Sequence, residues 1–397
     1  MSSTAPYKPT LLLVLILGAL TGFTPMSVDM YLPSFPALER YFAAEPSQVQ
    51  LTLSTFFLGL AIGQAIYGPV SDRFGRRPPL IFGAIVYIVA SLGCALSPSI
   101  QGLIAFRFLQ ALGGCVGMVI SRSIVRDLFD ERGAAKMFAT LMAIMGVAPI
   151  LAPLLGGQLL IYMSWQAMFW ILTGFGFLIL LAVWFGLKET LPEDRRRSLA
   201  LGSVLRTYVR ILSDRYFMGH SLSQSLTFAG MFAYITGSPF VLISLYGVPA
   251  EYYGFVFGAN AFGFIGAAQI NVRLLSRYTP GVLLLFGLSA AAVAGAIVFL
   301  AAITGVGGLA GILVPLFFFL TSLGFIGPNS TARALQPMGA NAGAASAVLG
   351  TIQFTMGGLS GAIVAALPKS SAVPMAAMIG GCAVLGLAMH RALVGRR

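Results

Sequence analysis

Charged residues are scarce in this sequence. Lysine, arginine, aspartate and glutamate make up 9% of the 397 residues, against roughly 25% in a typical soluble domain. Hydrophobic residues make up 58%, and the mean hydropathy is +0.90. Because a water-soluble fold has too little interior to hide so much apolar surface, the composition excludes a soluble globular protein. It predicts an all-α membrane protein embedded in the lipid bilayer.

Cysteine and histidine are also scarce. Cys94, Cys115 and Cys382 stand alone within apolar stretches, so the sequence predicts neither a disulfide framework nor a metal site. His220 and His390 alone give little basis for histidine chemistry. We therefore expect no metal and no cofactor.

The apolar residues fall into long runs that are separated by charges and prolines. A transmembrane helix needs about 20 mostly apolar residues. The first run begins like a signal peptide after Lys8 but lacks a cleavage pattern, so we expect a retained helix. The predicted spans are 10–33, 48–70, 79–97, 100–124, 136–161, 166–187, 217–246, 251–275, 281–303, 308–328, 342–367 and 373–393.

The most polar stretch, 188–216, separates six spans from six more. This layout predicts an N-terminal six-helix bundle over 1–187, a cytoplasmic linker over 188–216 and a C-terminal bundle over 217–397, with the substrate site between the bundles. If the N-terminus is inside, the outside loops hold only Arg40 and Lys369 of the basic residues. We therefore expect both termini in the cytoplasm. The basic residues behind the net charge of +12 therefore indicate which loops lie inside, and they do not indicate a nucleic-acid partner.

The most distinctive motif lies between the second and third spans. Gly68 and Gly75 permit tight turns in the short inside loop that we expect there. Pro69 and Pro78 are expected to stop helices. Asp72 is expected to pair with arginines or approach a helix N-terminus, as a latch that transport states form and break. A basic loop that sets topology and meets lipid headgroups is the alternative. The motif reads Gly68-Pro69-Val70-Ser71-Asp72-Arg73-Phe74-Gly75-Arg76-Arg77-Pro78.

This motif matches the G-x-x-x-D-R-x-G-R-R signature of the major facilitator superfamily at every fixed position. Residues 103–114 in the fourth span, which include Arg107 and Gln110, resemble the family's second motif. The resemblance implies the major facilitator fold. The candidates for its conformational gate are Gly68, Asp72, Arg73, Gly75, Arg76 and Arg77.

Residues 27–36 and 228–240 resemble, within that superfamily, the drug/proton antiporters of the bicyclomycin and chloramphenicol resistance group, Bcr/CflA. This resemblance implies a bacterial inner-membrane protein that exports drugs in exchange for protons, and we expect a monomer. Some relatives carry a second acidic residue about two turns before the position of Asp29, where this chain has Thr21. Export of two protons per drug, or a strong preference for cationic drugs, is therefore not expected.

Asp29 is the candidate proton carrier. It shares a helix face with Gly18, Gly22 and Pro25, which leave room for neighbouring helices. A carboxylate within the membrane is costly and indicates a functional site. We expect Asp29 to bind and release the proton, and Arg107 at a comparable depth to tune its proton affinity. The alternatives are a permanent Asp29–Arg107 ion pair, or an Asp29 that caps the helix near interfacial water.

Two further stripes of residues have open interpretations. The helix face of Arg107 also carries Gln110 and Ser121. Such a face suits either the wall of a wet cavity or tight helix packing. In the fifth span a kinked stripe of small residues favours ordinary close packing by its spacing. Its resemblance to the antiporter motif implies instead a seam that closes against a proton or ion leak. The stripe consists of Gly146, Pro149, Pro153 and Gly157.

A drug cavity is expected to be mostly apolar, with a few polar groups. Aromatic residues in membrane helices usually face lipid or other helices, whereas buried amides need partners. The candidates for the cavity wall are Tyr31, Gln50, Phe56, Phe228, Phe232, Tyr234, Asn260 and Gln353.

The sequence thus favours proton-coupled efflux of small, largely apolar, chloramphenicol- or bicyclomycin-like drugs by alternating access. A carrier for a cell metabolite such as an amino acid or sugar is the alternative, although it would place more fixed polar groups in the second half. A membrane enzyme would need a nucleophile, a metal cluster or a histidine–carboxylate pair. A channel would show repeated pore motifs or charge rings. The sequence contains neither pattern, so we expect no enzyme.

Overall fold

The computed structural model describes residues 10–196, 201–368 and 370–394, and helices dominate this part of the chain. The helices are α1 (Leu11–Asp29), η1 (Leu32–Ser34), α2 (Phe35–Phe42), α3 (Pro46–Phe74), α4 (Arg77–Ala95), α5 (Ile100–Leu128), α6 (Glu131–Tyr162), α7 (Gln166–Gly186), η2 (Glu193–Arg195), α8 (Leu201–Leu212), α9 (Arg215–Ser238), η3 (Pro239–Leu245), α10 (Ala250–Leu274), α11 (Pro280–Thr304), α12 (Gly308–Leu335), η4 (Gln336–Asn341), α13 (Ala342–Ala366) and α14 (Val373–Leu393).

Twelve helical segments among the described residues are long and apolar enough to cross a membrane. They confirm the twelve predicted spans, mostly to within a few residues. Their bounds are Leu11–Phe42, Pro46–Phe74, Arg77–Ala95, Ile100–Leu128, Lys136–Tyr162, Gln166–Gly186, Arg215–Leu245, Ala250–Leu274, Pro280–Thr304, Gly308–Gly339, Ala342–Ala366 and Val373–Leu393.

The first span is longer than predicted. Helical structure continues past the predicted end at 33 to Phe42, through η1 and α2. Pro33 and Pro36 are the second residues of these two short helices, within the first turn of each. There a missing backbone N–H costs nothing, because that N–H would have no partner within the helix. The prolines therefore begin new helical turns, and α1 itself ends at Asp29.

The second span also continues further, through most of the motif that was expected to form a loop. α3 includes Pro69 and ends at Phe74, so only Gly75 and Arg76 separate it from α4. Pro69 leaves the carbonyl of Ala65, one turn earlier, without its helical N–H donor. The Tyr208 hydroxyl of α8 donates to that carbonyl at 2.9 Å. This hydrogen bond satisfies the carbonyl that Pro69 frees within a continuous helix, and the prediction that Pro69 stops the helix is wrong.

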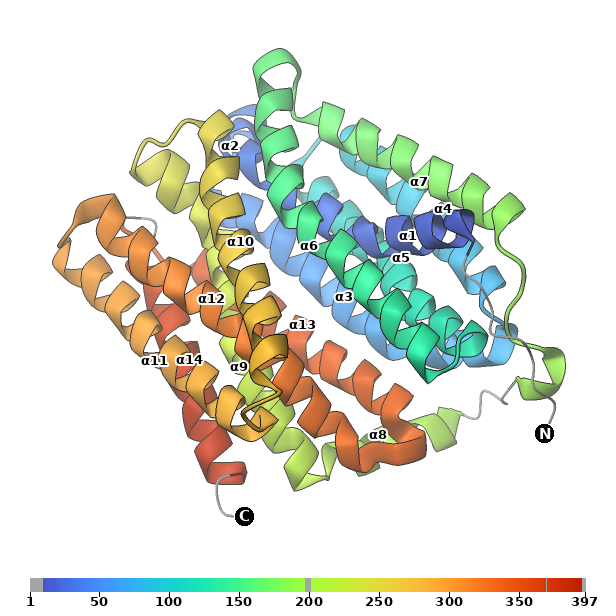
Figure 1. The fold of residues 1–397 in the computed structure, drawn as a ribbon. Coiled ribbons are helices and arrows are strands. Elements are labelled where there is room, and N and C mark those ends of the chain that lie inside the picture. The colour runs from blue at the N-terminus through green and yellow to red at the C-terminus, as the bar shows by residue number, and fades with distance from the viewer. Residues whose placement is uncertain (1–9, 197–200, 369, 395–397) are drawn as a thin grey trace.

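The transmembrane helices form two bundles (Figure 1). α1 and α3 to α7 pack against one another as the N-terminal bundle, and α9 to α14 form the C-terminal bundle. The two bundles meet mainly where α3 packs on α13 and α6 packs on α10. In Figure 1, α8 lies at the lower side and α2 at the upper side. We call these two ends of the molecule the α8 end and the α2 end.

Small residues allow the helices within each bundle to approach closely, as is common in membrane proteins. A Cβ atom on Gly113 of α5 would lie 2.5 Å from the backbone nitrogen of Tyr87 in α4. On Gly324 of α12 it would lie 2.6 Å from the carbonyl oxygen of Phe264 in α10. These contacts fix the central helices of each bundle against their neighbours.

Candidate functional site

Asp29 is the last residue of α1, at the point where the α-helix gives way to η1. Its exposed fraction is only 5%. Within the described part of the chain, its carboxylate takes part in no hydrogen bond or ion pair. It lies within electrostatic range of the Tyr234 and Tyr253 hydroxyls, which belong to the C-terminal bundle. The buried carboxylate therefore faces the boundary between the two bundles.

Arg107 of α5 is fully buried. Its Nη1 donates to Oε1 of Gln110 at 2.5 Å, and Nε2 of Gln110 donates to the Ser91 hydroxyl at 2.8 Å. Its guanidinium carbon lies 4.2 Å from the ring centroid of Phe56 and 4.5 Å from that of Tyr31. Its Nε and Nη2 have no hydrogen-bond partner among the described residues. Aromatic rings and one amide thus hold the charge, leaving the N–H groups of two guanidinium nitrogens unused.

Asp29 and Arg107 do not form the ion pair that was one alternative for them. Among the described residues no hydrogen bond or ion pair joins them, and the guanidinium of Arg107 instead contacts Gln110 and the rings of Tyr31 and Phe56. The other alternative was an Asp29 that caps the helix near interfacial water. α1 does end at Asp29, but the side chain is buried and accepts no hydrogen bond from a backbone N–H among the described residues, so the structure does not favour this alternative. The role of Asp29 as proton carrier stays a prediction.

Two predicted cavity residues, Tyr31 and Phe56, lie against Arg107. The Tyr31 hydroxyl shares a hydrogen bond of 2.8 Å with that of Thr52, which fixes its ring. The sequence analysis missed Phe169, whose ring centroid lies 5.8 Å from the guanidinium carbon. Phe169 comes from α7, and no spacing pattern connects it to the fourth span.

Tyr234 and Asn260 lie together on the C-terminal side of the boundary. Nδ2 of Asn260 donates to the Tyr234 hydroxyl at 3.0 Å, and the Tyr234 ring stacks on Phe257 with centroids 5.5 Å apart. Tyr253 shares a 2.8 Å hydrogen bond with the hydroxyl of Ser238. Tyr253 and Phe257 were not predicted as site residues, although Tyr253, Phe257 and Asn260 recur at helical spacing in α10.

The other predicted cavity residues are spread over separate contacts. Phe232 packs on Phe57 of α3 across the bundle boundary, with ring centroids 4.5 Å apart. Phe228 lies beside Phe264, at 6.5 Å, within the C-terminal bundle. Gln353 accepts a hydrogen bond of 3.2 Å from Gln224. These residues therefore do not share one local cluster with Asp29.

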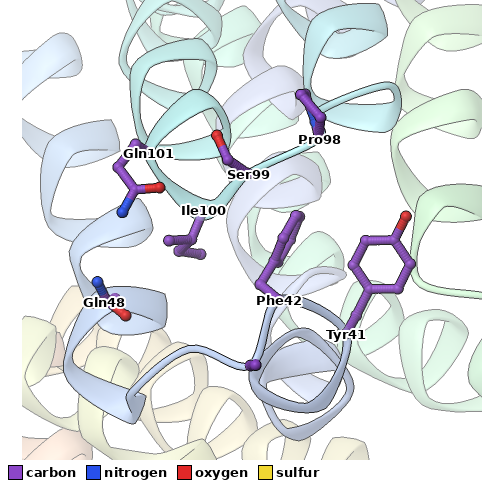
Figure 2. A pocket seen from close by; sticks show the side chains of 8 residues that line it. Tyr41, Phe42, Gln48, Pro98, Ser99, Ile100 and Gln101 are labelled. Carbon is purple, nitrogen blue, oxygen red and sulfur yellow. The ribbon is translucent and has the colours of Figure 1, made fainter.

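Gln50 lies nearer the α2 end, where it lines a cavity of about 10 Å³ with Phe240 and Met375. That volume is about what one water molecule needs. A larger surface hollow of about 520 Å³ lies at the same end between α2, the start of α3 and the α4–α5 loop (Figure 2). Tyr41, Gln48 and Gln101 line it, and none of the predicted cavity residues do. We therefore do not assign this hollow to transport.

The small-residue stripe of α6 packs against α10. A Cβ atom on Gly146 would lie 3.2 Å from Cδ1 of Ile265, and one on Gly157 would lie 2.8 Å from the carbonyl oxygen of Ala250. Pro149 and Pro153 lie inside the helix between them. The stripe therefore forms a close seam between the two bundles.

The motif at the α8 end forms an ion-pair network. Arg76 is buried, and its Nη1 lies 2.7 Å from Asp72 while its Nε lies 2.8 Å from Asp127 of α5. Burial alone would lower the pKa of Arg76, but the hydrogen bonds to Asp127 and Asp72 raise it above its ordinary value. The predicted pairing of Asp72 with an arginine is present. The ion pair of Asp127 was not predicted, because Asp127 and its partner Arg76 lie far apart in the sequence.

Glu189, in the segment after α7, caps the start of α4. Its carboxylate accepts hydrogen bonds from the backbone N–H groups of Arg76 at 2.8 Å and Arg77 at 3.1 Å. Burial alone would raise the pKa of Glu189, but these and the N–H groups of Leu191 and Thr190 lower it below the ordinary value of 4.5. The sequence analysis did not anticipate this cap.

Of the remaining motif residues, Gly75 is the most constrained. Its φ of 91° is a conformation that residues with a Cβ rarely adopt, and a Cβ would lie 2.5 Å from the Glu189 carboxylate. Gly68 is helical, and a Cβ there would meet nothing within 4 Å. Arg77 donates to the carbonyl of Trp184, whereas Arg73 is exposed. All these partners belong to the N-terminal bundle and the segment that follows it.

A model of the Major Facilitator Superfamily matches residues 17–365. The chain belongs to this superfamily. It is therefore a transporter with a small-molecule substrate, and its twelve spans make it a multi-pass protein of the bacterial inner membrane. The family predicted from the motif is confirmed.

Two curated relatives align with nearly the whole chain. An uncharacterized MFS-type transporter, YdgK of Bacillus subtilis, is 38% identical over 382 residues, which cover 96% of this chain and 94% of the relative. A bicyclomycin resistance protein homolog of Haemophilus influenzae is 31% identical over 389 residues, covering 98% of each. The second match supports the predicted bicyclomycin-resistance group.

Among solved structures, a D-xylose-proton symporter superposes with a TM-score of 0.76 at 15% identity, covering 97% of this chain and 98% of that one. At this identity the likeness shows the fold alone.

Proposed function

We propose that this transporter exports small, largely apolar drugs, of the chloramphenicol or bicyclomycin kind, in exchange for protons. The observation that carries the proposal is Asp29. Its carboxylate is buried, unpaired within the described chain and directed to the bundle boundary, where Tyr234 and Asn260 lie on the other side. The relative named as a bicyclomycin resistance protein homolog supports the drug class.

Proton coupling follows from the cost of a charge in this place. A carboxylate away from water and without a partner is unfavourable in its charged form, so Asp29 favours protonation when the boundary is closed. Drug binding or water entry at the boundary stabilises the charged form. Because such coupling is reciprocal, proton release strengthens drug binding to the same extent that drug binding promotes proton release.

Arg107 gives the drug site a fixed positive group. Its planar guanidinium is held between the rings of Phe56 and Tyr31, and its Nε and Nη2 lack partners among the described residues. These N–H groups suit a carbonyl, nitro or hydroxyl oxygen of a neutral drug. In a conformation that brings α1 closer to α5, they also suit Asp29.

Alternating access requires the two bundles to move relative to each other about the site. The Asp72–Arg76–Asp127 network supports a rigid N-terminal bundle, because it joins α3, α4 and α5. The α6–α10 seam supports closure against a proton leak. We further propose bundles over 1–187 and 217–397, a cytoplasmic linker over 188–216, both termini in the cytoplasm and a monomeric transporter.

The test is drug-induced proton movement in proteoliposomes that contain the purified protein and a trapped pH indicator. Chloramphenicol, bicyclomycin and a cationic dye are added in turn, with protein-free liposomes as the control. We expect the neutral drugs to drive proton movement more strongly than the dye. Absence of proton movement with every drug, in protein shown to be folded, would contradict the proposal and favour the metabolite carrier.

A further inference from the structure

The linker helix α8 has two apolar sides. Tyr208 and Ile211 face the protein, and Ile211 is only 3% exposed. The opposite side carries Leu205, Val209 and Leu212, which are 64%, 54% and 45% exposed. Spacings of four and three residues place these three side chains on one stripe of the helix. A linker helix in water would gain nothing from such a stripe.

The inner side of α8 joins both bundles. Ile211 belongs to an apolar cluster with Phe217 of α9 and Val348 of α13 in the C-terminal bundle. Tyr208 donates to the Ala65 carbonyl of α3 in the N-terminal bundle, the carbonyl that Pro69 leaves without a helical donor. These two contacts fix α8 in place and determine the direction of its outer stripe.

The contact of α8 with α3 lies beside exposed apolar side chains of that span. Ala65 lies about 13 Å inside the end of α3, counting 1.5 Å per residue, so Tyr208 reaches the depth of a membrane span. Its neighbours Ile62 and Ile66 on α3 are 44% and 47% exposed, as lipid-facing side chains are. The point where α8 contacts α3 therefore lies next to exposed apolar side chains of a membrane span.

Arg206 and Arg210 lie beside the stripe, one turn apart and exposed. Neither forms an ion pair with any residue that the structure describes. An amphipathic helix with an apolar stripe and unpaired arginines suits the surface of a leaflet that contains anionic lipid. We propose that α8 is a lipid-binding element, with Leu205, Val209 and Leu212 among the acyl chains and Arg206 and Arg210 on the phosphates of anionic phospholipids.

The location of α8 gives this lipid contact a consequence. α3 and α13 form one of the two main contacts between the bundles, and α8 packs on α13 while bonding to α3. Anionic lipid that holds α8 therefore stabilises the arrangement in which Tyr208 reaches Ala65. The prediction concerns binding and stability, so it does not depend on which substrate the transporter carries.

The first test measures the depth of the stripe. Leu205→Cys is labelled with an environment-sensitive fluorophore after Cys94, Cys115 and Cys382 are replaced, and the protein is reconstituted with brominated phospholipid. We expect strong quenching at Leu205 and weak quenching for the control Asp194→Cys, an exposed linker position. Equal, weak quenching at both positions would place the stripe in water and overturn the proposal.

The second test measures headgroup binding without transport. Thermal unfolding in neutral detergent is followed while phosphatidylglycerol, phosphatidylcholine or inorganic phosphate is added to the wild type and to Arg206→Gln/Arg210→Gln. We expect stabilisation by phosphatidylglycerol alone, and about a 25-fold weaker apparent affinity in the variant, about fivefold for each arginine.

The matched control is Arg273→Gln/Arg277→Gln, which removes the same charge outside α8. It should respond to phosphatidylglycerol as the wild type does. An unchanged response in the α8 variant would overturn the proposal. So would equal stabilisation by inorganic phosphate, because it would indicate a soluble-anion site.

Discussion

The two bundles differ in the chemistry of their buried polar groups. Asp29, Arg76 and Arg107, which are charged side chains in the ordinary ionisation state, are all buried in the N-terminal bundle. The sequence from 217 onward contains one acidic residue, Glu251, near the start of α10. The buried polar side chains of the C-terminal bundle include amides, such as that of Asn260, and hydroxyls. Among the described residues, the buried carboxylate and guanidinium groups therefore lie in the N-terminal bundle, whereas amides, hydroxyls and the imidazoles of His220 and His390 are buried in the C-terminal bundle.

The α8 end repeats the contrast. In the N-terminal bundle, Arg76 joins the carboxylates of α3 and α5. In the C-terminal bundle, α10 and α12 are joined by amides, because Nδ2 of Asn329 donates to Oδ1 of Asn271 at 2.6 Å. An ion network responds to pH and to loss of one partner more strongly than an amide pair does.

The largest effect is expected from removing the charge of Arg107. Arg107→Met should lower transport by about 10- to 100-fold, since a hydrogen bond to a charged group contributes about 1.5–3 kcal/mol. Thermal stability should stay the same or rise, because a buried charge is replaced by an apolar side chain. Arg107→Lys should not restore transport, since an ammonium cannot stack between two rings. Transport assays and thermal unfolding of the same preparations check this.

A loss of stability that parallels the loss of transport in Arg107→Met would contradict this prediction. It would assign Arg107 to structure alone.

The second effect compares the two networks at the α8 end. Arg76→Gln should lower the free energy of unfolding by about 3–5 kcal/mol, because it leaves two carboxylates without their partner. Asn329→Leu, which removes the amide donor in the C-terminal bundle, should cost about 1–3 kcal/mol. Denaturant unfolding in detergent measures both. Equal costs would remove the contrast between the bundles.

A smaller effect is expected from the two glycines of the motif. Gly75→Ala should cost about 1–3 kcal/mol, because its φ is unfavourable for alanine and its Cβ would meet Glu189. Gly68→Ala is the matched control. It should be neutral or stabilise the helix by up to about 1 kcal/mol, because α3 is regular there and the space is open. Comparable losses of stability in both variants would argue against this account of Gly75.

The smallest effect concerns pH and Glu189. Its pKa is lower in the folded protein than the ordinary 4.5, so its contribution to stability is present above pH 4.5 and is lost as the pH falls through the folded pKa. Glu189→Gln should therefore unfold at a temperature that depends less on pH below this value. A variant with the acid sensitivity of the wild type would indicate that another carboxylate is responsible.

The sequence predicted the number of spans and the family well, because long apolar runs and a dense motif are local signals. It failed where the outcome depended on distant partners. Pro69 stays within α3 with the help of Tyr208, which lies far along the chain. α8 was missed because a short amphipathic helix within a polar linker has no long apolar run.

The candidate site was predicted less completely. Asp29 and Arg107 were identified by their cost within a membrane, and both are buried. Their surroundings were only partly predictable. Phe169 comes from α7, which no spacing pattern connects to the fourth span, whereas Tyr253 shares a helical spacing with the candidate Asn260 in α10. No sequence pattern indicates that Asp29 faces the boundary between the two bundles, because this depends on how the helices pack.

The most direct test of the central proposal compares drug exchange with drug-driven proton movement in Asp29→Asn proteoliposomes. The matched control is Glu251→Gln, the same kind of change near the start of α10. We expect Asp29→Asn to exchange labelled drug across the membrane without moving protons, while the control does both. Proton movement at the wild-type rate in Asp29→Asn would contradict the account, because another group would then carry the proton.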